Sequence, residues 1–360
     1  MRNHQQSLIG LLNSSSSEFE KEALAQFILL DTDAIAHTFV DVAFMVTAMK
    51  FIQEQYWILS KDRDLELKTI NFQGFVKKLF KVELAPILFL HSELEASSIE
   101  EVETIKNKAS VILDLISKYV KGFALAEKHI FAVSAAKFIS ELIEYEHQII
   151  SKKQDQNLHL GYSLDRTFDE LDRIFGLDYL VDKKILPTAD FGTERVFEGS
   201  GMGVQSSYST ILLALRYLRI PKGARFIDLG AGFGRVGFVV GLLRPDVIFS
   251  GYEIVTERVA VVNKAIQDFG LEKNVKFIAQ DLSSLDFVIP DADIYYLYDP
   301  FSVETYKHVL TQLSVIATRK KINIITSGET RQVMQELSQR GRWSPPQIFE
   351  SGHFCLFRSL

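Results

Sequence analysis

The 360-residue sequence has little of what disulfide-rich, thiolate-metal or nucleic-acid-coating proteins need. Its single cysteine, Cys355, excludes an internal disulfide framework, a cysteine-rich zinc site and an iron–sulfur cluster. One cysteine also fits a reducing compartment. With 40 basic and 46 acidic side chains, the net charge of −6 argues against a protein that coats nucleic acid or an anionic membrane.

Targeting and membrane signals are also absent. The apolar stretch at 8–12 is too short for a signal peptide. A longer apolar stretch at 34–52 carries His37, Asp41 and Lys50, and an aspartate at mid-span costs roughly 2.5–3.5 kcal/mol on membrane-insertion scales. We interpret this stretch as a buried helix and expect a cytoplasmic protein without a membrane partner.

Common catalytic and metal-binding motifs are missing as well. The eight histidines are scattered without metal-ligand spacing, and no G-x-S-x-G turn or G-x-x-x-x-G-K-[ST] loop occurs. His37, His129 and His147 lie within helical patterns and are interpreted as structural. The sequence therefore predicts no metal site.

The first part of the chain has the pattern of helices alone. Its apolar residues recur at three- and four-residue spacing, and proline appears there once, at Pro86. Helices are expected at 17–30, 33–59, 69–81, 99–120 and 123–150, and a shorter one with a capping-box pattern at 167–175. A polar stretch at 151–159 has the composition of a linker.

From about residue 199 onward, short β-rich runs alternate with helical ones. Strands are expected at 225–229, 247–253, 275–279, 293–298, 321–326, 347–350 and 353–358. The alternation predicts right-handed βαβ units in a mostly parallel sheet, closed by an antiparallel pair. The expected domains are an all-helical one at 1–160, a connecting segment at 161–198 and an α/β domain at 199–360.

The most informative segment is the run at 226–237, where an apolar strand enters a glycine-rich turn and a helix begins directly afterwards. Glycine lets the backbone bend sharply there and lets a ligand approach without a Cβ in the way. The G-x-G-x-x-G spacing at 232–237 fits the dinucleotide fingerprint, which puts a pyrophosphate at the helix amino terminus. A nicotinamide dinucleotide is therefore one candidate ligand.

The same turn resembles motif I of the class I S-adenosylmethionine (SAM) methyltransferases. Gly230, Gly232 and Gly234 have the motif's spacing, and Asp228 precedes them. A carboxylate suits a cofactor that carries an ammonium and a sulfonium, and it is unfavourable beside a pyrophosphate. Asp228 therefore favours SAM, although it can instead be a structural acceptor within the turn.

The resemblance extends along the chain and implies further cofactor contacts. Glu253 ends the second strand, where a carboxylate can accept hydrogen bonds from both ribose hydroxyls of SAM or of NAD. Asp281 matches the family's acidic residue near the adenine amino group, and Leu282 would offer its backbone amide to the ring. Asp281 can instead cap its loop. The resemblance implies a Rossmann-like seven-strand methyltransferase domain preceded by an all-α domain.

A loop at 198–208 leads into an apolar helix at 209–218. Its small and hydroxyl-bearing residues suit contacts with the methionine end of SAM, for which Gln205 and Ser207 are the candidates. The loop loosely resembles that of the non-SET histone-lysine methyltransferases. A flexible domain connector is the alternative interpretation.

The segment D-I-Y-Y-L-Y-D-P-F at 293–301 resembles motif IV, which meets the methyl acceptor. Asp299, with Tyr298 before it, is the catalytic candidate and could orient an acceptor amine. The segment lacks the second proline of the amino-directed DNA and glutamine enzymes, and Asp299 could instead cap the next helix or contact SAM. The acidic net charge and the lack of a basic face disfavour a nucleic-acid acceptor.

Together these features predict a SAM-dependent methyltransferase that acts on a protein side chain or a small molecule. An NAD(P)-dependent oxidoreductase and a SAM-binding regulatory or scaffold protein without turnover are the alternatives. We expect the helical region to supply part of the acceptor site, and an independent module on a tether is the competing interpretation.

Overall fold

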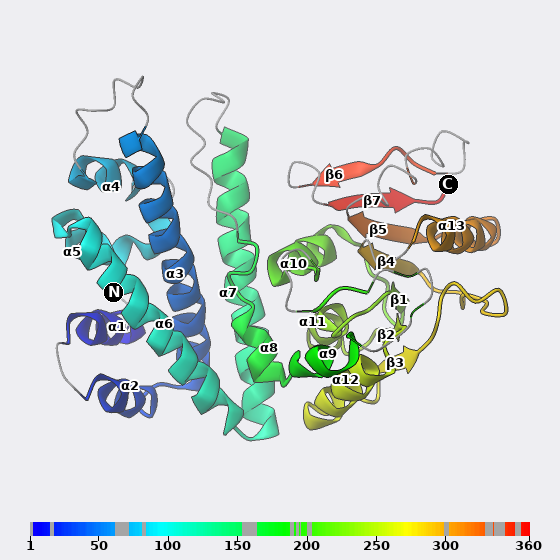
Figure 1. Cartoon of the computed structure of the whole chain (residues 1–360), viewed down its shortest axis with the longest axis horizontal. Coiled ribbons are helices and arrows are strands. Elements are labelled where there is room, and N and C mark those ends of the chain that lie inside the picture. The colour runs from blue at the N-terminus through cyan, green and yellow to red at the C-terminus, as the bar shows by residue number, and fades with distance from the viewer. Residues whose placement is uncertain are drawn as a thin grey trace. The chain divides into compact units, whose positions relative to one another are not determined.

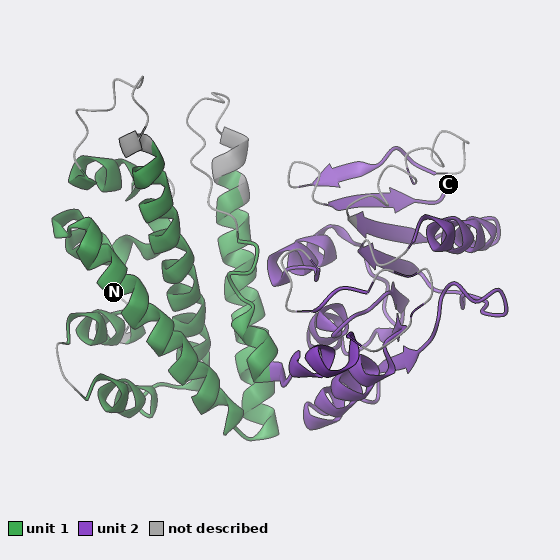
Figure 2. Cartoon of the chain, viewed as in Figure 1, with its two compact units in different colours: residues 1–174 green, residues 175–360 purple. Residues whose placement is uncertain are grey.

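The computed structural model describes residues 3–14, 18–61, 72–80, 84–152, 164–187, 191, 194, 196–199, 204–298, 302–327, 334, 343–349 and 354–360. The chain divides into unit 1, residues 1–174, and unit 2, residues 175–360 (Figure 2). The domain boundaries expected at 160 and 198 stay a prediction. Residues 175–198, expected within the connecting segment, fall in unit 2.

Unit 1 is built from helices (Figure 1). They are α1 (Asn3–Asn13), α2 (Phe19–Phe27), α3 (Thr32–Lys61), α4 (Phe72–Phe80), the 3-10 helix η2 (Ala85–Leu90), α5 (His91–Ala96), α6 (Ile99–Lys121), α7 (Leu125–Lys152) and α8 (Glu170–Phe175), which reaches the unit boundary. The periodicity predicted the long helices α3, α6 and α7, whereas α1, η2 and α5 were not expected. These three segments are short, so few apolar repeats mark them.

The long helix α3 forms the centre of unit 1, with α6 and α7 packed along it. Its stretch Thr32–Ile58 is long and apolar enough to cross a membrane by length and composition alone, but 78% of its most apolar window is buried within the protein. Phe39, Met45 and Ile52, for example, are fully buried along it. Burial on this scale matches the buried helix expected from the sequence.

Helix starts in unit 1 agree with the sequence only in part. α6 begins with a capping box, in which Ser98 Oγ accepts the Glu101 amide and the Glu101 carboxylate accepts the Ser98 amide. The helix start predicted at Thr167 was wrong, because α8 begins at Glu170 and Thr167 Oγ1 instead shares a 2.9 Å hydrogen bond with Thr47 Oγ1. Ser17, which with Glu20 has the capping-box pattern at the start of the helix expected at 17–30, lies outside the described residues.

Unit 2 contains, within its described residues, a seven-stranded sheet in the order β3-β2-β1-β4-β5-β7-β6. The strands are β1 (Arg225–Leu229), β2 (Ile248–Glu253), β3 (Val275–Ala279), β4 (Ile294–Tyr298), β5 (Asn323–Ser327), β6 (Gln347–Phe349) and β7 (Phe354–Arg358). β1 to β5 pair in parallel, and β7 runs antiparallel to both β5 and β6. The predicted α/β class, the parallel sheet and the antiparallel pair are confirmed.

Of the described helices of unit 2, two precede β1 and the other three connect strands (Figure 1). They are α9 (Leu180–Ile185), α10 (Tyr208–Tyr217), α11 (Arg235–Leu243), α12 (Thr256–Asp268) and α13 (Val303–Ala317). The sequence also has a helical pattern at 329–340, which lies almost wholly outside the described residues. Strand order reverses between β1 and β4, and open α/β sheets bind ligands at the carboxyl ends of the strands beside such a switch point.

Candidate functional site

The turn after β1 has a backbone that favours glycine. Gly230, Gly232 and Gly234 have φ angles of 84°, 52° and 78°, a region that costs other residues about 1–2 kcal/mol. Among the described residues, nothing lies within 4 Å of the position that a Cβ on Gly232 would take. A Cβ on Gly234 would lie 2.6 Å from Val262 and 2.8 Å from Phe277. Gly232 therefore borders open space, whereas Gly234 packs against α12 and β3.

Gly237, the last glycine of the dinucleotide spacing, has a packing role. A Cβ on it would lie 2.5 Å from Phe277 and 2.8 Å from Phe249, so only glycine lets α11 approach β2 and β3 this closely. This close packing explains why a glycine occurs at position 237, so the G-x-G-x-x-G spacing does not by itself require a bound pyrophosphate.

Asp228 is a buried carboxylate in β1, 3% exposed, whose register partners are Gly251 in β2 and Tyr296 in β4. Burial, together with the negative charge of Glu253, raises the pKa of Asp228 well above its usual range. Within the part of the chain that the structure describes, no group donates a hydrogen bond to this carboxylate. The alternative role as an acceptor within the turn therefore finds no donor there, and the carboxylate is suited to an external cation or donor.

Glu253, at the end of β2, binds the glycine turn. Its Oε2 accepts the Gly232 N–H at 2.8 Å, and its Oε1 accepts the Val255 N–H at 3.0 Å. Arg258 Nη1 lies 3.6 Å from Oε1. Burial raises the pKa of Glu253, although Arg258 and the two amides oppose the shift. Since a carboxylate has about four lone-pair positions, the described donors leave one position on Oε2 for a ribose hydroxyl.

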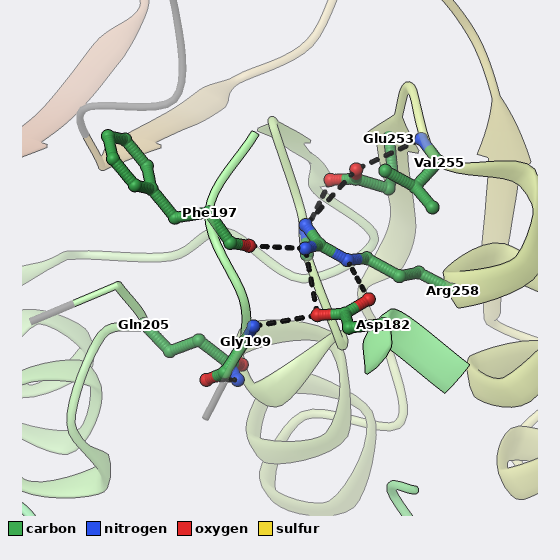
Figure 3. Close-up of polar contacts among 8 residues, drawn as sticks. Asp182, Phe197, Gly199, Gln205, Glu253, Val255 and Arg258 are labelled. Atoms are coloured by element: carbon green, nitrogen blue, oxygen red, sulfur yellow. Dashed lines mark hydrogen bonds and ion pairs between the residues drawn. The ribbon is translucent and has the colours of Figure 1, made fainter. Parts of the chain in front are cut away.

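A buried ion pair lies beside Glu253 (Figure 3). Arg258, in the first turn of α12, donates from Nε and Nη2 to the two carboxylate oxygens of Asp182 in α9, each at 2.9 Å. Asp182 is fully buried and Arg258 is 6% exposed. Arg258 also donates to the Phe197 carbonyl, and Asp182 accepts the Gly199 N–H at 2.7 Å. The ion pair thus holds residues 197–199 close to Glu253.

The loop that follows is held by further hydrogen bonds. Gln205 Nε2 donates to the Gly199 carbonyl at 2.9 Å (Figure 3). Ser207 is the N-cap of α10, and its Oγ accepts an amide N–H of the first turn at 3.1 Å. Ser206 Oγ accepts the Tyr296 hydroxyl at 2.7 Å, which links the loop to β4. Both candidates for the methionine end of SAM, Gln205 and Ser207, therefore also hold the loop itself.

Glu194, in the segment that leads to this loop, is hydrogen-bonded to the start of α13, the helix that follows β4 in the chain. Its carboxylate accepts the N–H and the hydroxyl of Ser302, each at 3.0 Å, and the hydroxyl of Thr305. Ser302 is the N-cap of α13, a role that the sequence had left open for Asp299. Asp299 lies outside the described residues. Tyr298 is the last residue of β4 and is partly buried.

The loop after β3 holds the two candidates for adenine contact. Asp281 Oδ1 accepts the N–H and the hydroxyl of Ser283 at 2.8 Å and 2.6 Å. This oxygen therefore caps its own loop, which was the alternative role expected from the sequence. The Asp281 side chain is exposed and stays accessible to an adenine amino group. Leu282 is 5% exposed, and its side chain packs in the apolar cluster that contains Tyr252 and Ile289.

Sequence reasoning missed the Asp182–Arg258 pair. The two residues are 76 positions apart, and Asp182 lies in a segment expected to be a connector. A basic residue in the first turn of the helix after a strand-ending acid was the available signal for Arg258. Arg235, the first residue of α11, was also missed, and it donates to the Ser206 carbonyl at 3.2 Å.

Comparison with known proteins gives short or distant matches. No family model matches this chain. It is 36% identical over 61 residues to the ribosomal RNA small subunit methyltransferase G of Moorella thermoacetica, a match that covers 17% of this chain and 25% of that protein. The chain thus spans about a quarter of the length of this curated relative.

Similar solved structures include TrmN from Thermus thermophilus, at 15% identity and a TM-score of 0.35, over 43% of this chain and 49% of that one. Precorrin-6y C5,15-methyltransferase from Geobacter metallireducens is 13% identical, with a TM-score of 0.35, over 44% and 91%. A SAM-dependent O-methyltransferase from Thermotoga maritima is 16% identical, with a TM-score of 0.35, over 43% and 66%. The narrower resemblance to lysine methyltransferases finds no support in these comparisons. The strand order itself shows that unit 2 has the Rossmann-like, seven-strand fold, in which β7, the last strand of the chain, runs antiparallel to β5.

Proposed function

We propose that the chain is a SAM-dependent methyltransferase whose cofactor binds at the turn after β1. The observation that carries this proposal is the buried Asp228 carboxylate, to which no described group donates. The ammonium group of SAM would supply the missing positive charge. A dinucleotide would instead bring a pyrophosphate toward Asp228 and Glu253, where like charges repel.

The other groups around the turn fit the same cofactor. The open side of Gly232 admits a ligand against the backbone, and the free position on Glu253 Oε2 suits a ribose hydroxyl. Asp281 is exposed where the adenine amino group is expected. Gln205 is the better candidate for the methionine end, because its described hydrogen bond uses Nε2 alone, whereas Ser207 Oγ caps α10 and also bonds the hydroxyls of Ser209 and Thr210.

When bound, SAM supplies a methyl group on a sulfonium, which is a good leaving group. The chain then has to hold an acceptor in line with the methyl group and exclude water, and positioning of this kind can supply much of the rate enhancement. We assign acceptor contact to Tyr298, the last residue of β4, and to Asp299, which follows it in the sequence. Asp299 would accept a hydrogen bond from an acceptor amine and so direct its lone pair toward the methyl group.

We assign the acceptor to protein side chains or small molecules. The net charge of −6 is unfavourable for binding a phosphate backbone. The short match to a ribosomal RNA methyltransferase makes RNA the acceptor class that an experiment has to separate.

The test is methyl transfer from labelled SAM into a cell lysate by the full chain, with the Asp228→Asn variant as the control. Protein, RNA and small-molecule fractions are counted separately. We expect label in the protein or small-molecule fraction and its loss with the variant. Ribonuclease-sensitive label would overturn the acceptor assignment but not the activity. SAM binding without any transfer would favour the regulatory or scaffold alternative.

A further inference from the structure

Three side chains that commonly ligate metals meet in unit 1, in a place that the sequence pattern did not indicate. His4 lies in α1, and His37 and Asp41 lie in α3, against which α1 packs (Figure 1). His4 Nε2 is 3.4 Å from Asp41 Oδ2, and His37 Nδ1 is 3.1 Å from the same oxygen. All three ligand atoms lie within 4.8 Å of one another. Two imidazole nitrogens thus converge on one carboxylate oxygen.

The cluster is largely shielded from water. His4 is 5% exposed and Asp41 is 8% exposed, and the side chain of His37 is 13% exposed. The ring of His37 lies 4.2 Å from that of Phe138 in α7, measured between centroids, and Leu8, one turn after His4, is buried. Polar groups in such surroundings need partners that compensate for lost hydration.

We propose that His4, His37 and Asp41 form a binding site for a divalent transition-metal ion of the Zn²⁺ type. His37 and Asp41 are four residues apart and so share one face of α3. A tetrahedral Zn²⁺ with bonds of about 2.0–2.2 Å separates its ligand atoms by about 3.3–3.6 Å. The separations of 3.4 Å and 3.1 Å between each imidazole nitrogen and Asp41 Oδ2 are within a few tenths of an ångström of this range, and the two imidazole nitrogens, which lie within 4.8 Å of each other, would move together around an ion.

The ligand types select the kind of ion. Imidazole nitrogen with carboxylate oxygen suits Zn²⁺ and its transition-metal neighbours, whereas Ca²⁺ and Mg²⁺ take mainly oxygen ligands in greater number. Three protein ligands leave a fourth position for water. An ion there would join α1 to α3, and its binding free energy would add to the stability of unit 1.

The competing account is a hydrogen-bonded group in which the imidazoles donate to Asp41 and no ion is needed. Metal titration of the full chain, stripped with a chelator, separates the two accounts. We expect one Zn²⁺ to bind per chain by calorimetry and to raise the unfolding temperature. Co²⁺ should bind without a thiolate absorption band, which excludes binding at Cys355. A folded wild-type chain that binds neither ion would overturn the proposal.

Variants then identify the ligands. Asp41→Asn and His37→Gln keep the side-chain size, and each should weaken Zn²⁺ binding by more than about a hundredfold, the upper end for loss of an outer-shell partner. His129→Gln in α7 is the matched control and should bind Zn²⁺ like the wild type. Unchanged affinity in folded ligand variants would contradict the site. If these variants do not fold, the wild-type titration with Zn²⁺ and Co²⁺ decides the proposal.

Discussion

The Gly232 amide donates a 2.8 Å hydrogen bond to Glu253 Oε2, although the two residues are 21 positions apart. This bond joins the glycine turn after β1 to the carboxyl end of β2. The two sequence features that indicated a cofactor are therefore parts of one hydrogen-bonded group. A substitution at either residue is expected to affect both the shape of the turn and the cofactor.

The two glycines of the turn should respond differently to alanine. Gly232→Ala costs about 1–2 kcal/mol of backbone strain, but its Cβ meets no described atom of the chain, so the variant should fold and lose SAM binding. Gly234→Ala adds overlap with Val262 and Phe277 and should lower stability further. Denaturant unfolding and SAM titration measure the two effects. Normal SAM affinity in a folded Gly232→Ala variant would place the cofactor elsewhere.

Asp228 should make the stability of the free chain depend on pH. Because its pKa is raised in the folded state, its contribution to stability is full below its ordinary value of 3.8 and is lost as pH rises through the folded pKa. Asp228→Asn should therefore stabilise the free chain at neutral pH and flatten this decline, while weakening SAM binding. Urea unfolding from about pH 4 to about pH 8 checks the sign. A variant less stable than the wild type throughout would mean that the carboxylate has donors.

Glu253 should be tested by a conservative change. Glu253→Ala would also release Gly232 and Arg258, so the loss of SAM affinity would be mixed with a loss of stability. Glu253→Gln keeps the size of the side chain, but its NH2 group must face one of the two amides that Glu253 accepts, from Gly232 or from Val255, so some stability is lost here too. SAM binding should weaken about ten- to hundredfold, as expected for loss of a charge-assisted hydrogen bond of about 1.5–3 kcal/mol, and unfolding measures the accompanying loss of stability. Glu257→Gln, exposed in the first turn of α12, is the control and should bind SAM normally.

The buried ion pair should contribute strongly to stability when only one partner is removed. Asp182→Ala leaves Arg258 buried without its bidentate partner, and this should lower the free energy of unfolding by about 3–5 kcal/mol. Asp268→Ala removes a partner of the exposed Lys264 on the same helix and should have little effect. Equal, small effects of the two changes would contradict the buried pairing.

Fragments should show where the SAM-binding unit begins. Phe175 stacks on Phe238, with ring centroids 4.8 Å apart, and Asp182 holds Arg258. A fragment starting at residue 175 should therefore bind SAM, and one starting at residue 190 should be less stable and bind it more weakly. We also expect the fragment that starts at 175 to lose transfer to the native acceptor. Full transfer by that fragment would place the acceptor site wholly within unit 2.

The sequence predicted the sheet well because its signals are local. The strand before Gly230 and the acid that ends β2 stand in short patterns, and the observed strands begin and end within about two residues of the expected positions. The hydrogen-bond partners of individual hydroxyl and carboxylate side chains were harder to predict from the sequence. Ser207 caps α10, although a serine hydroxyl at this position suited a cofactor contact equally well.

Tertiary pairings could not be predicted from these patterns. Asp182 meets Arg258 across 76 positions, and His4 meets Asp41 across 37 positions. Neither pair has a characteristic spacing, because its geometry depends on how separate helices pack. The sequence prediction of no metal site relied on spacing alone, which does not detect side chains that two separate helices bring together; it stays a prediction.

The most direct test of the proposed cofactor is calorimetric titration of the full wild-type chain with SAM and, separately, with NAD. We predict saturable binding of one SAM per chain, weakened by Asp228→Asn, and no measurable binding of NAD. Binding of NAD without binding of SAM would contradict the assignment of the Asp228 carboxylate to a cationic cofactor, and with it the proposed methyltransferase.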